Sequence, residues 1–301
     1  MLSFILIILA ASIFTGIVNR VRSLVSGRKG PGLFQPIRDV VRLFRKGSVY
    51  SDTCSWIFKL APSVSMATVL MAMLVIPFAR TKGVLSFEGD FVFFAYVLAL
   101  GKFFSIIASW DTGNSFEGMG ASREALYSTL AEPAFFILIG SFAMLTGYTS
   151  FYDIFRTLHF GSYISYLLGL LATFVLITLA MIENSRMPVD DPRTHLELTM
   201  IHEVMILDNS GFDLGLILST SYLKFALYGA LIANFFIDIM PWYIAIPSFF
   251  GIQFLVAIAV GIWESFTARF RMSHNPQFIF ILSSVSLLIF FGVMLVLHMF
   301  N

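Results

Sequence analysis

The chain has 301 residues, of which 58% are hydrophobic and 12% are charged. Soluble domains average about 45–50% apolar residues. With only 19 Lys and Arg and 18 Asp and Glu, a soluble protein of this length could not cover its surface with charge. The composition therefore excludes an ordinary soluble enzyme and predicts an integral membrane protein.

Charge and cysteine content exclude two further classes. The net charge of +1 gives no overall field that would favour nucleic acid. The single cysteine, Cys54, excludes a disulfide framework, a thiolate zinc site and an iron–sulfur cluster held by this chain alone. We therefore expect no metal site and no cofactor bound by this chain, so that any redox centre belongs to a partner.

Apolar runs of about 18 residues or more, long enough to cross a hydrocarbon core of roughly 30 Å, recur along the chain. We predict an all-α, polytopic membrane protein in which residues 1–301 form a single transmembrane domain. The first run lacks a preceding positive residue, so we expect an uncleaved helix and not a signal peptide. The eight predicted spans are Leu2–Val18, Trp56–Phe78, Phe91–Trp110, Leu126–Thr146, Tyr163–Ile182, Leu214–Met240, Trp242–Phe266 and Gln277–Phe300.

The basic residues are unevenly distributed between the two sides of these spans. Fourteen of the 19 Lys and Arg fall in the loops after spans one, three, five and seven or, in the case of Lys59, in the first turn of the span that follows, and three fall on the other side. The positive-inside rule therefore predicts a multi-pass protein of the cytoplasmic membrane with these loops in the cytoplasm and both termini outside.

The segment 27–48, GRKGPGLFQPIRDVVRLFRKGS, contains an amphipathic pattern. Ile37, Val40 and Phe44 recur at a spacing of three and four residues, with Arg38 and Arg42 between them. This spacing predicts a cytoplasmic helix along the membrane surface, with one apolar and one basic face. Anchoring to lipid headgroups and docking of a partner both remain open for it.

Charged residues within the apolar runs are the first functional candidates, because a charge inside a membrane costs several kcal/mol on most scales. Glu132 precedes Pro133 inside the fourth span, beside an expected helix break, and Lys224 lies midway along the sixth. For Lys102 and Asp238 we favour the structural interpretation of snorkelling or pairing. For Glu132 and Lys224 we favour a functional one.

The loop 183–213, ENSRMPVDDPRTHLELTMIHEVMILDNSGFD, concentrates acidic residues. Leu196, Met200, Val204 and Leu207 follow Pro192 at helical spacing, so we expect a helix there. The acidic residues of the loop are Glu183, Asp190, Asp191, Glu197, Glu203, Asp208 and Asp213. Closely placed carboxylates cannot all stay ionised in a poorly hydrated site, so these acids, together with the two histidines of the segment, could accept and pass protons.

Two other interpretations of this loop stay open. His195, His202 and Glu203 could be metal ligands, although their spacing lacks the four-residue HExxH pattern. Alternatively, the loop could only dock the basic surface of a partner.

Several long motifs resemble a known family. They are GPGLFQPIRDVVRLF after the first span, GMGASREALYSTLAEP entering the fourth, ENSRMPVDDPRTHLELTMIHEVM, and ARFRMSHNPQ before the eighth. With the eight spans, they resemble the membrane subunit shared by respiratory complex I, where it is subunit 1, and by energy-converting nickel–iron hydrogenases of the formate hydrogenlyase and hydrogenase-4 type. The resemblance covers essentially the whole chain.

The resemblance implies an adaptor without catalysis of its own. It would dock the loop 183–213 beneath a hydrophilic arm whose large and small subunits hold iron–sulfur clusters and a nickel–iron centre, and start a proton path into antiporter-like membrane subunits. We assign to this path Glu132, Glu183, Asp190, Asp191, His195, Glu197, His202, Glu203, Asp208 and Lys224. Structural or charge partners are Arg123, Glu124, Arg186, Pro188, Pro192 and Arg193.

Two departures indicate the hydrogenase branch. Arg193 stands where quinone-reducing members usually have glutamate, and His195 replaces another acid. We therefore expect a coupling subunit of an energy-converting hydrogenase that moves protons or sodium. The alternatives are a quinone-site subunit of complex I and, from another class, a stand-alone secondary transporter, against which the absence of symmetric halves argues.

Overall fold

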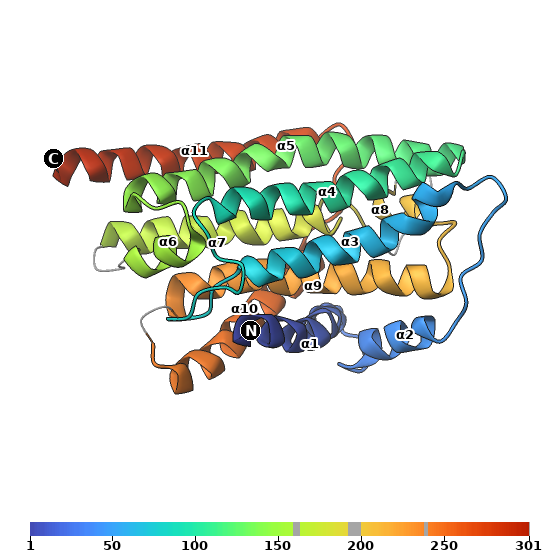
Figure 1. The fold of residues 1–301 in the computed structure, drawn as a ribbon, viewed down its shortest axis with the longest axis horizontal. Coiled ribbons are helices and arrows are strands. Elements are labelled where there is room, and N and C mark those ends of the chain that lie inside the picture. Colours follow the sequence, from blue (N-terminus) through green and yellow to red (C-terminus); the bar gives the residue numbers. More distant parts are fainter. Residues whose placement is uncertain (159–162, 192–199, 238–239, 301) are drawn as a thin grey trace.

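The computed structural model describes residues 1–158, 163–191, 200–237 and 240–300. Within these ranges the chain forms eleven helices and no β-strand, which confirms the all-α prediction. Figure 1 shows them. Their bounds are α1 Leu2–Val25, α2 Gln35–Phe44, α3 Trp56–Val75, α4 Asp90–Asp111, α5 Ser115–Thr146, α6 Phe151–Thr157, α7 Tyr163–Glu183, α8 His202–Met205, α9 Gly211–Ile237, α10 Trp242–Phe266 and α11 Asn275–Phe300.

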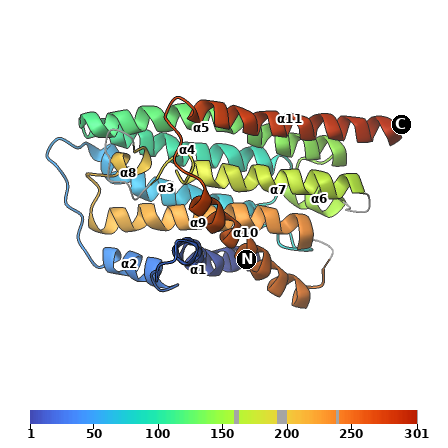
Figure 2. The ribbon, with the colours of Figure 1, turned by 180° about the vertical axis from the view of Figure 1, so that it is seen from behind.

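The long helices form a bundle. The helices α3, α4, α5, α7, α9 and α11 run side by side along the long axis of the molecule (Figure 1). The helices α1 and α10 pack against each other, and α10 crosses the bundle obliquely (Figure 2). The connections from α2 to α3 and from α4 to α5 lie with α8 at one end of the bundle, and the C-terminal end of α11 lies at the other (Figure 1).

The predicted spans correspond to these helices. In the described part of the chain, seven helices have the length and apolar composition of membrane spans. The remaining predicted span, Tyr163–Ile182, corresponds to α7. The described apolar stretch of α7, Leu167–Glu183, is shorter than those of the other seven helices. The protein is therefore a multi-pass membrane protein.

The helix α5 departs from its prediction in two ways. It begins at Ser115 and not at Leu126, because Asn114 caps it by accepting the Phe116 N–H at 3.1 Å. Its 32 residues span about 48 Å, longer than a hydrocarbon core of roughly 30 Å, and its first turns pack against α8. The break expected beside Glu132 is wrong, since the helix continues through Pro133 to Thr146. Pro133 is exposed and lies inside this helix.

The amphipathic helix predicted in 27–48 is present as α2, with Pro36 in its first turn. Its buried Val40 packs toward α9, and Arg38 and Arg42 are exposed. Between α1, α2, α3 and α9 lies an apolar groove of about 220 Å³, lined by residues such as Ile37, Met66 and Leu223. The position of α2 at a membrane surface stays a prediction.

A glycine sets the separation of α3 and α4 next to the charged centre. A Cβ at Gly101 would overlap the Thr68 hydroxyl. The Ser65 hydroxyl donates to the Gly101 carbonyl oxygen at 3.1 Å. This close approach fixes the side of α4 from which Lys102 projects.

Candidate functional site

Lys102 is the centre of a buried cluster of charges. Its ammonium Nζ lies 2.8 Å from Glu124 Oε1 of α5 and 3.0 Å from Glu183 Oε2 at the end of α7. The lysine side chain is only 8% exposed. One cation from α4 therefore holds two carboxylates from two other helices.

Lys224 supplies the second cation of the cluster. Its Nζ lies 3.7 Å from the same Glu183 Oε2, so Glu183 is shared between two lysines. Glu124 has a further neighbour in Ser185, whose hydroxyl donates to its Oε2 at 3.3 Å. Pairing of this kind is what allows charges to be buried at all.

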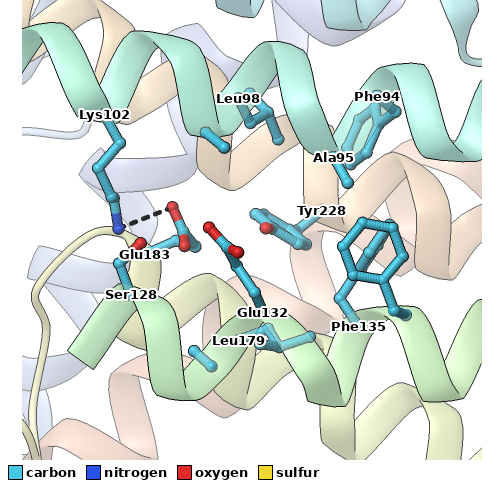
Figure 3. A pocket seen from close by; sticks show the side chains of 13 residues that line it. Phe94, Ala95, Leu98, Lys102, Ser128, Glu132, Phe135, Leu179, Glu183 and Tyr228 are labelled. Carbon is cyan, nitrogen blue, oxygen red and sulfur yellow. Dashed lines mark ion pairs between the residues drawn. The ribbon is translucent and has the colours of Figure 1, made fainter. Parts of the chain in front are cut away.

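Glu132 extends the cluster along α5. Figure 3 shows its carboxylate pointing into a small pocket beside Glu183 and Lys102, with Tyr228 and Phe94 on the walls. On the outer side, next to Glu132, α4 and α5 form an apolar groove of about 560 Å³. The carboxylate thus lies between the buried lysine and the outer face of the bundle.

The charges of this cluster do not cancel. Glu124, Glu132 and Glu183 bring three negative charges, whereas Lys102 and Lys224 bring two positive ones when all five are ionised. Glu132 is exposed on the outer side of the bundle, whereas the other four side chains are largely buried, and an unbalanced negative charge beside such buried pairs is costly. The arrangement therefore favours the uptake of one more proton or small cation.

Asp190 organises the end of the acidic loop. Its carboxylate is completely buried and accepts the N–H groups of Asp191 at 2.9 Å, Ile201 at 3.0 Å and His202 at 3.1 Å. Arg269 pairs with it at 3.1 Å. Burial raises the pKa of the Asp190 carboxyl, although Arg269 and the N–H donors act in the opposite direction. This residue holds the start of α8 against the cluster.

A second ion network joins the loop to α1 and α10. Glu264 of α10 is completely buried in its side chain and lies 3.6 Å from Arg22 and 3.3 Å from Arg186. Arg22 also lies 3.6 Å from Asp191. Arg186 stacks over the Phe225 ring at 5.3 Å. The loop after α7 is thus tied to α1 and α10 by ion pairs.

His202 stands between the loop and the cluster. It is half-buried and lines two small cavities, one shared with Lys224 and Glu183 and the other shared with Ser109 and Asn209. Burial lowers the pKa of its imidazole, and Lys224 and Lys102 act in the same direction, whereas Glu124 opposes them. The ring is therefore mainly neutral near pH 7.

The remaining predicted residues lie around this site. Arg123 donates to the Met200 carbonyl oxygen at 3.0 Å, and the Pro188 carbonyl oxygen accepts the Phe270 N–H at 3.0 Å. Glu203 is half-buried in α8, and Asp208 is exposed. Pro192, Arg193, His195 and Glu197, with the helix start expected after Pro192, and Asp238 lie outside the described residues.

Sequence reasoning missed several members of the site. The pairing expected for Lys102 is present, but its partners Glu124 and Glu183 on two other helices could not be specified from the sequence. The signal was present, because Lys102 stands alone in an apolar run. Glu264, Arg22 and Arg269 gave no such signal, since each lies near the end of a predicted span.

The sequence profile of the family described as NADH dehydrogenase matches residues 1–296. The chain belongs to the NADH dehydrogenase family. This membership confirms the family resemblance of the motifs.

Curated relatives of this NADH dehydrogenase family member include hydrogenase components. Hydrogenase-4 component C of Escherichia coli is 31% identical over 64% of this chain and 61% of its own length. Formate hydrogenlyase subunit 4 of the same organism is 27% identical over 86% of this chain and 76% of its own length. An NADH-quinone oxidoreductase subunit of Rickettsia africae is 26% identical over 83% of this chain and 77% of its own length. The chain thus spans about three fifths of the length of the first relative. The printed names of these relatives describe each as a component or subunit.

A solved structure has the same fold. It is a chain of the membrane-bound sulfane sulfur reductase, an archaeal respiratory membrane complex, with a TM-score of 0.79 and 18% identity over 97% of this chain and 98% of that chain.

Within the residues that the structure describes, no three His, Cys, Asp or Glu side chains are grouped so as to hold a metal ion. Metal centres in partner subunits of this NADH dehydrogenase family member stay a prediction.

Proposed function

We propose that the chain is the membrane subunit of an energy-converting hydrogenase or formate hydrogenlyase type of complex, coupling electron transfer in a hydrophilic arm to proton movement. The observation that carries this proposal is the buried cluster of Lys102, Glu124, Glu183 and Lys224, with Glu132 on its outer side. Such intramembrane charges are costly and are typical of proton paths.

The coupling in this proposal is electrostatic. Reduction of a centre in the arm adds negative charge above Asp190, Asp191 and Glu203 and increases their affinity for protons. A proton taken up there offsets the surplus negative charge of the buried cluster. It then moves toward Glu132, from which it leaves this chain.

The proposed partners follow from the same assignment. A hydrophilic arm with large and small hydrogenase-like subunits would hold the iron–sulfur clusters and the nickel–iron centre over the loop 183–213, and antiporter-like membrane subunits would receive the proton. The similarity to hydrogenase-4 component C and formate hydrogenlyase subunit 4 supports this choice. We place the complex in the cytoplasmic membrane, with both termini outside, on the charge bias of the loops.

The test is Glu132→Gln in the assembled complex. Glutamine keeps the size of the side chain and cannot carry a proton, so we expect assembly to be intact and proton translocation per electron to fall at least tenfold. The measurement is a pH-sensitive dye in proteoliposomes, with reduced methyl viologen as electron donor. Glu88→Gln, an exposed acid between α3 and α4, is the control. Full coupling in the Glu132 variant would show that the assigned role is wrong.

The apolar groove between α1, α2, α3 and α9 favours a second candidate, a quinone-reducing complex I subunit. Its lining is almost entirely apolar, as the binding of isoprene units would require. An assay of nickel, iron, flavin and quinone in the complex, purified through a tag on this chain, separates the two. Nickel with little quinone supports the hydrogenase assignment, and iron with quinone but no nickel supports complex I.

A further inference from the structure

Three neighbouring spaces in the bundle share the carboxylates of the charged cluster as lining groups. The inner cavity, of about 50 Å³, is lined by Glu183 with Lys224 and His202. The central cavity, of about 40 Å³, is lined by Glu183 again and by Glu132. Glu132 also lines the outer groove between α4 and α5. Each of the two glutamates therefore borders two of these spaces, and both border the central cavity.

Tyr228 of α9 brings a hydroxyl to the central cavity. It lies four residues after Lys224, so both side chains are on the same face of α9. The tyrosine is buried, and Figure 3 shows it beside the carboxylates of Glu132 and Glu183. These two carboxylates are the charged groups that act electrostatically on the phenol. The hydroxyl is therefore close to both the glutamate of the buried cluster and the glutamate of the outer face.

The rest of the cavity lining limits which groups can carry a proton between the two glutamates. Phe94 and Phe135 stack at a centroid distance of 5.6 Å and form part of its apolar wall. Ser128, one turn before Glu132 on α5, brings a second hydroxyl. A polar cavity of at least about 10–15 Å³ can hold a water molecule, which needs two to four polar partners. The two carboxylates and the two hydroxyls supply such partners.

We propose that the Tyr228 hydroxyl relays the proton from Glu183 to Glu132, together with one water molecule in the central cavity. This inference rests on the proposed function. Protonated Glu183 gives its proton to the water, the water gives one of its protons to the Tyr228 oxygen, and the phenolic proton passes to the Glu132 carboxylate. At the end Glu183 is ionised and Glu132 is protonated, whereas the water and the phenol are again neutral.

The charges around the central cavity favour this direction of transfer. Lys102 and Lys224 lie 3.0 Å and 3.7 Å from Glu183 and stabilise its carboxylate once the proton has left. Glu132 is exposed at the outer groove, from which its proton can leave the chain. A hydroxyl can accept one proton while it donates another, so the relay places no additional net charge on the buried Tyr228.

The test is Tyr228→Phe in the assembled complex in proteoliposomes. Phenylalanine keeps the ring and removes only the hydroxyl, so we expect intact assembly and a fall of roughly tenfold or more in the rate of proton translocation. Tyr127→Phe is the matched control, because Tyr127 is a buried tyrosine that lines none of these three spaces. Normal translocation in Tyr228→Phe would overturn the inference.

A tyrosine analogue separates proton transfer from packing. Difluorotyrosine at position 228 keeps a hydroxyl that is more acidic than that of tyrosine. The relay predicts faster translocation than in Tyr228→Phe, with the decrease at alkaline pH displaced to lower pH, because the phenol must be protonated to donate. Recovery with an unchanged pH profile would indicate a purely structural hydroxyl and would also contradict the relay.

Two further variants separate this inference from the proposed function. Ser128→Ala removes the other hydroxyl of the central cavity and should slow translocation less than Tyr228→Phe does; a larger effect would assign the transfer to the serine and overturn the inference. If Glu132→Gln blocks translocation while Tyr228→Phe does not, the relay is wrong and the proposed function stands. If Glu132→Gln translocates normally, the proposed function itself fails, and the relay fails with it.

Discussion

At the scale of single residues, the site depends on charges that are buried only because they are shared. The Lys102 ammonium contacts two carboxylates and the Glu183 carboxylate contacts two lysines, so each group has more than one partner. Removal of one partner leaves a buried charge without compensation, which costs about 3–5 kcal/mol. Each of these residues therefore contributes to the stability of the site, in addition to the role proposed for it in proton movement.

Lys102→Met tests the structural contribution. We expect a clear decrease in the thermal midpoint of the detergent-solubilised complex, because Glu124 and Glu183 lose their common cation. The double variant Lys102→Met with Glu124→Gln should recover part of the loss, since one of the two carboxylates is neutralised. Lys46→Met, an exposed lysine after α2, is the control. An unchanged midpoint for Lys102→Met would contradict the pairing.

His202 predicts a pH dependence of stability. Burial lowers the pKa of His202, so the unfolded chain binds more protons at this position once the pH falls below the ordinary histidine value of about 6.5. Above that pH both states are neutral and stability is unaffected. The thermal midpoint should therefore decrease between pH 7 and 5.5, and the decrease should be smaller in His202→Gln.

The control for this measurement is His274→Gln, because His274 is exposed before α11. Its midpoint should follow that of the unsubstituted protein at each pH. A decrease of the same size in His202→Gln would mean that other groups cause the acid sensitivity.

At the scale of elements, the site depends on how closely the helices approach one another. The helix α4 can bring Lys102 to Glu183 because Gly101 packs directly on Thr68 of α3. The long α5 carries Glu124 in the part that precedes the predicted span and Glu132 two turns further on. Helix spacing and helix length thus set the separation between the charges.

Gly101→Ala tests this spacing. The added methyl group overlaps the Thr68 hydroxyl, so we expect a destabilisation of about 1–3 kcal/mol, typical of overpacking. Thr68→Ala in the same chain removes the clash and should restore most of the stability. Gly140→Ala in α5 is the control, because a Cβ there meets nothing within 4 Å. The checking measurement is the thermal midpoint; equal midpoints for both glycine variants would rule out a close contact.

At the scale of the whole molecule, charge is segregated between the two ends of the bundle. The described residues of the acidic loop, with α8, and the segment from α2 to α3 lie at one end, and α6 lies at the other (Figure 1). Because fourteen of the 19 lysines and arginines lie in the predicted loops after spans one, three, five and seven or in the turn that follows them, we expect that end to face the cytoplasm.

The orientation can be tested with single cysteines, because Cys54 is the only cysteine of the chain. In a Cys54→Ser background, Lys29→Cys should react with a membrane-impermeant maleimide only in inside-out vesicles. Val84→Cys, exposed between α3 and α4, should react in intact cells. The opposite pattern would reverse the topology and with it the proposed site of the hydrophilic arm.

Much of the fold followed from composition and periodicity. Apolar runs of sufficient length located the spans, because the bilayer imposes a minimum length and excludes unpaired backbone groups. Because a charged side chain is costly in lipid, the sequence alone was enough to predict functional roles for Glu132 and Lys224. The start of α5 was missed, because the polar cap and first turns of this helix lie outside the apolar run that defines a span.

By itself, the sequence determined that the chain is a bundle of membrane helices, that its family is that of the complex I and hydrogenase membrane subunits, and that its acids concentrate after the fifth span. Only the tertiary structure decided which charges meet. Glu124, Glu183, Lys102 and Lys224 come from four different helices, and Glu117 meets Asp208 across 91 positions. Periodicity reports which residues share a face of one helix, whereas contacts between helices depend on their crossing angles and packing, which no local pattern specifies.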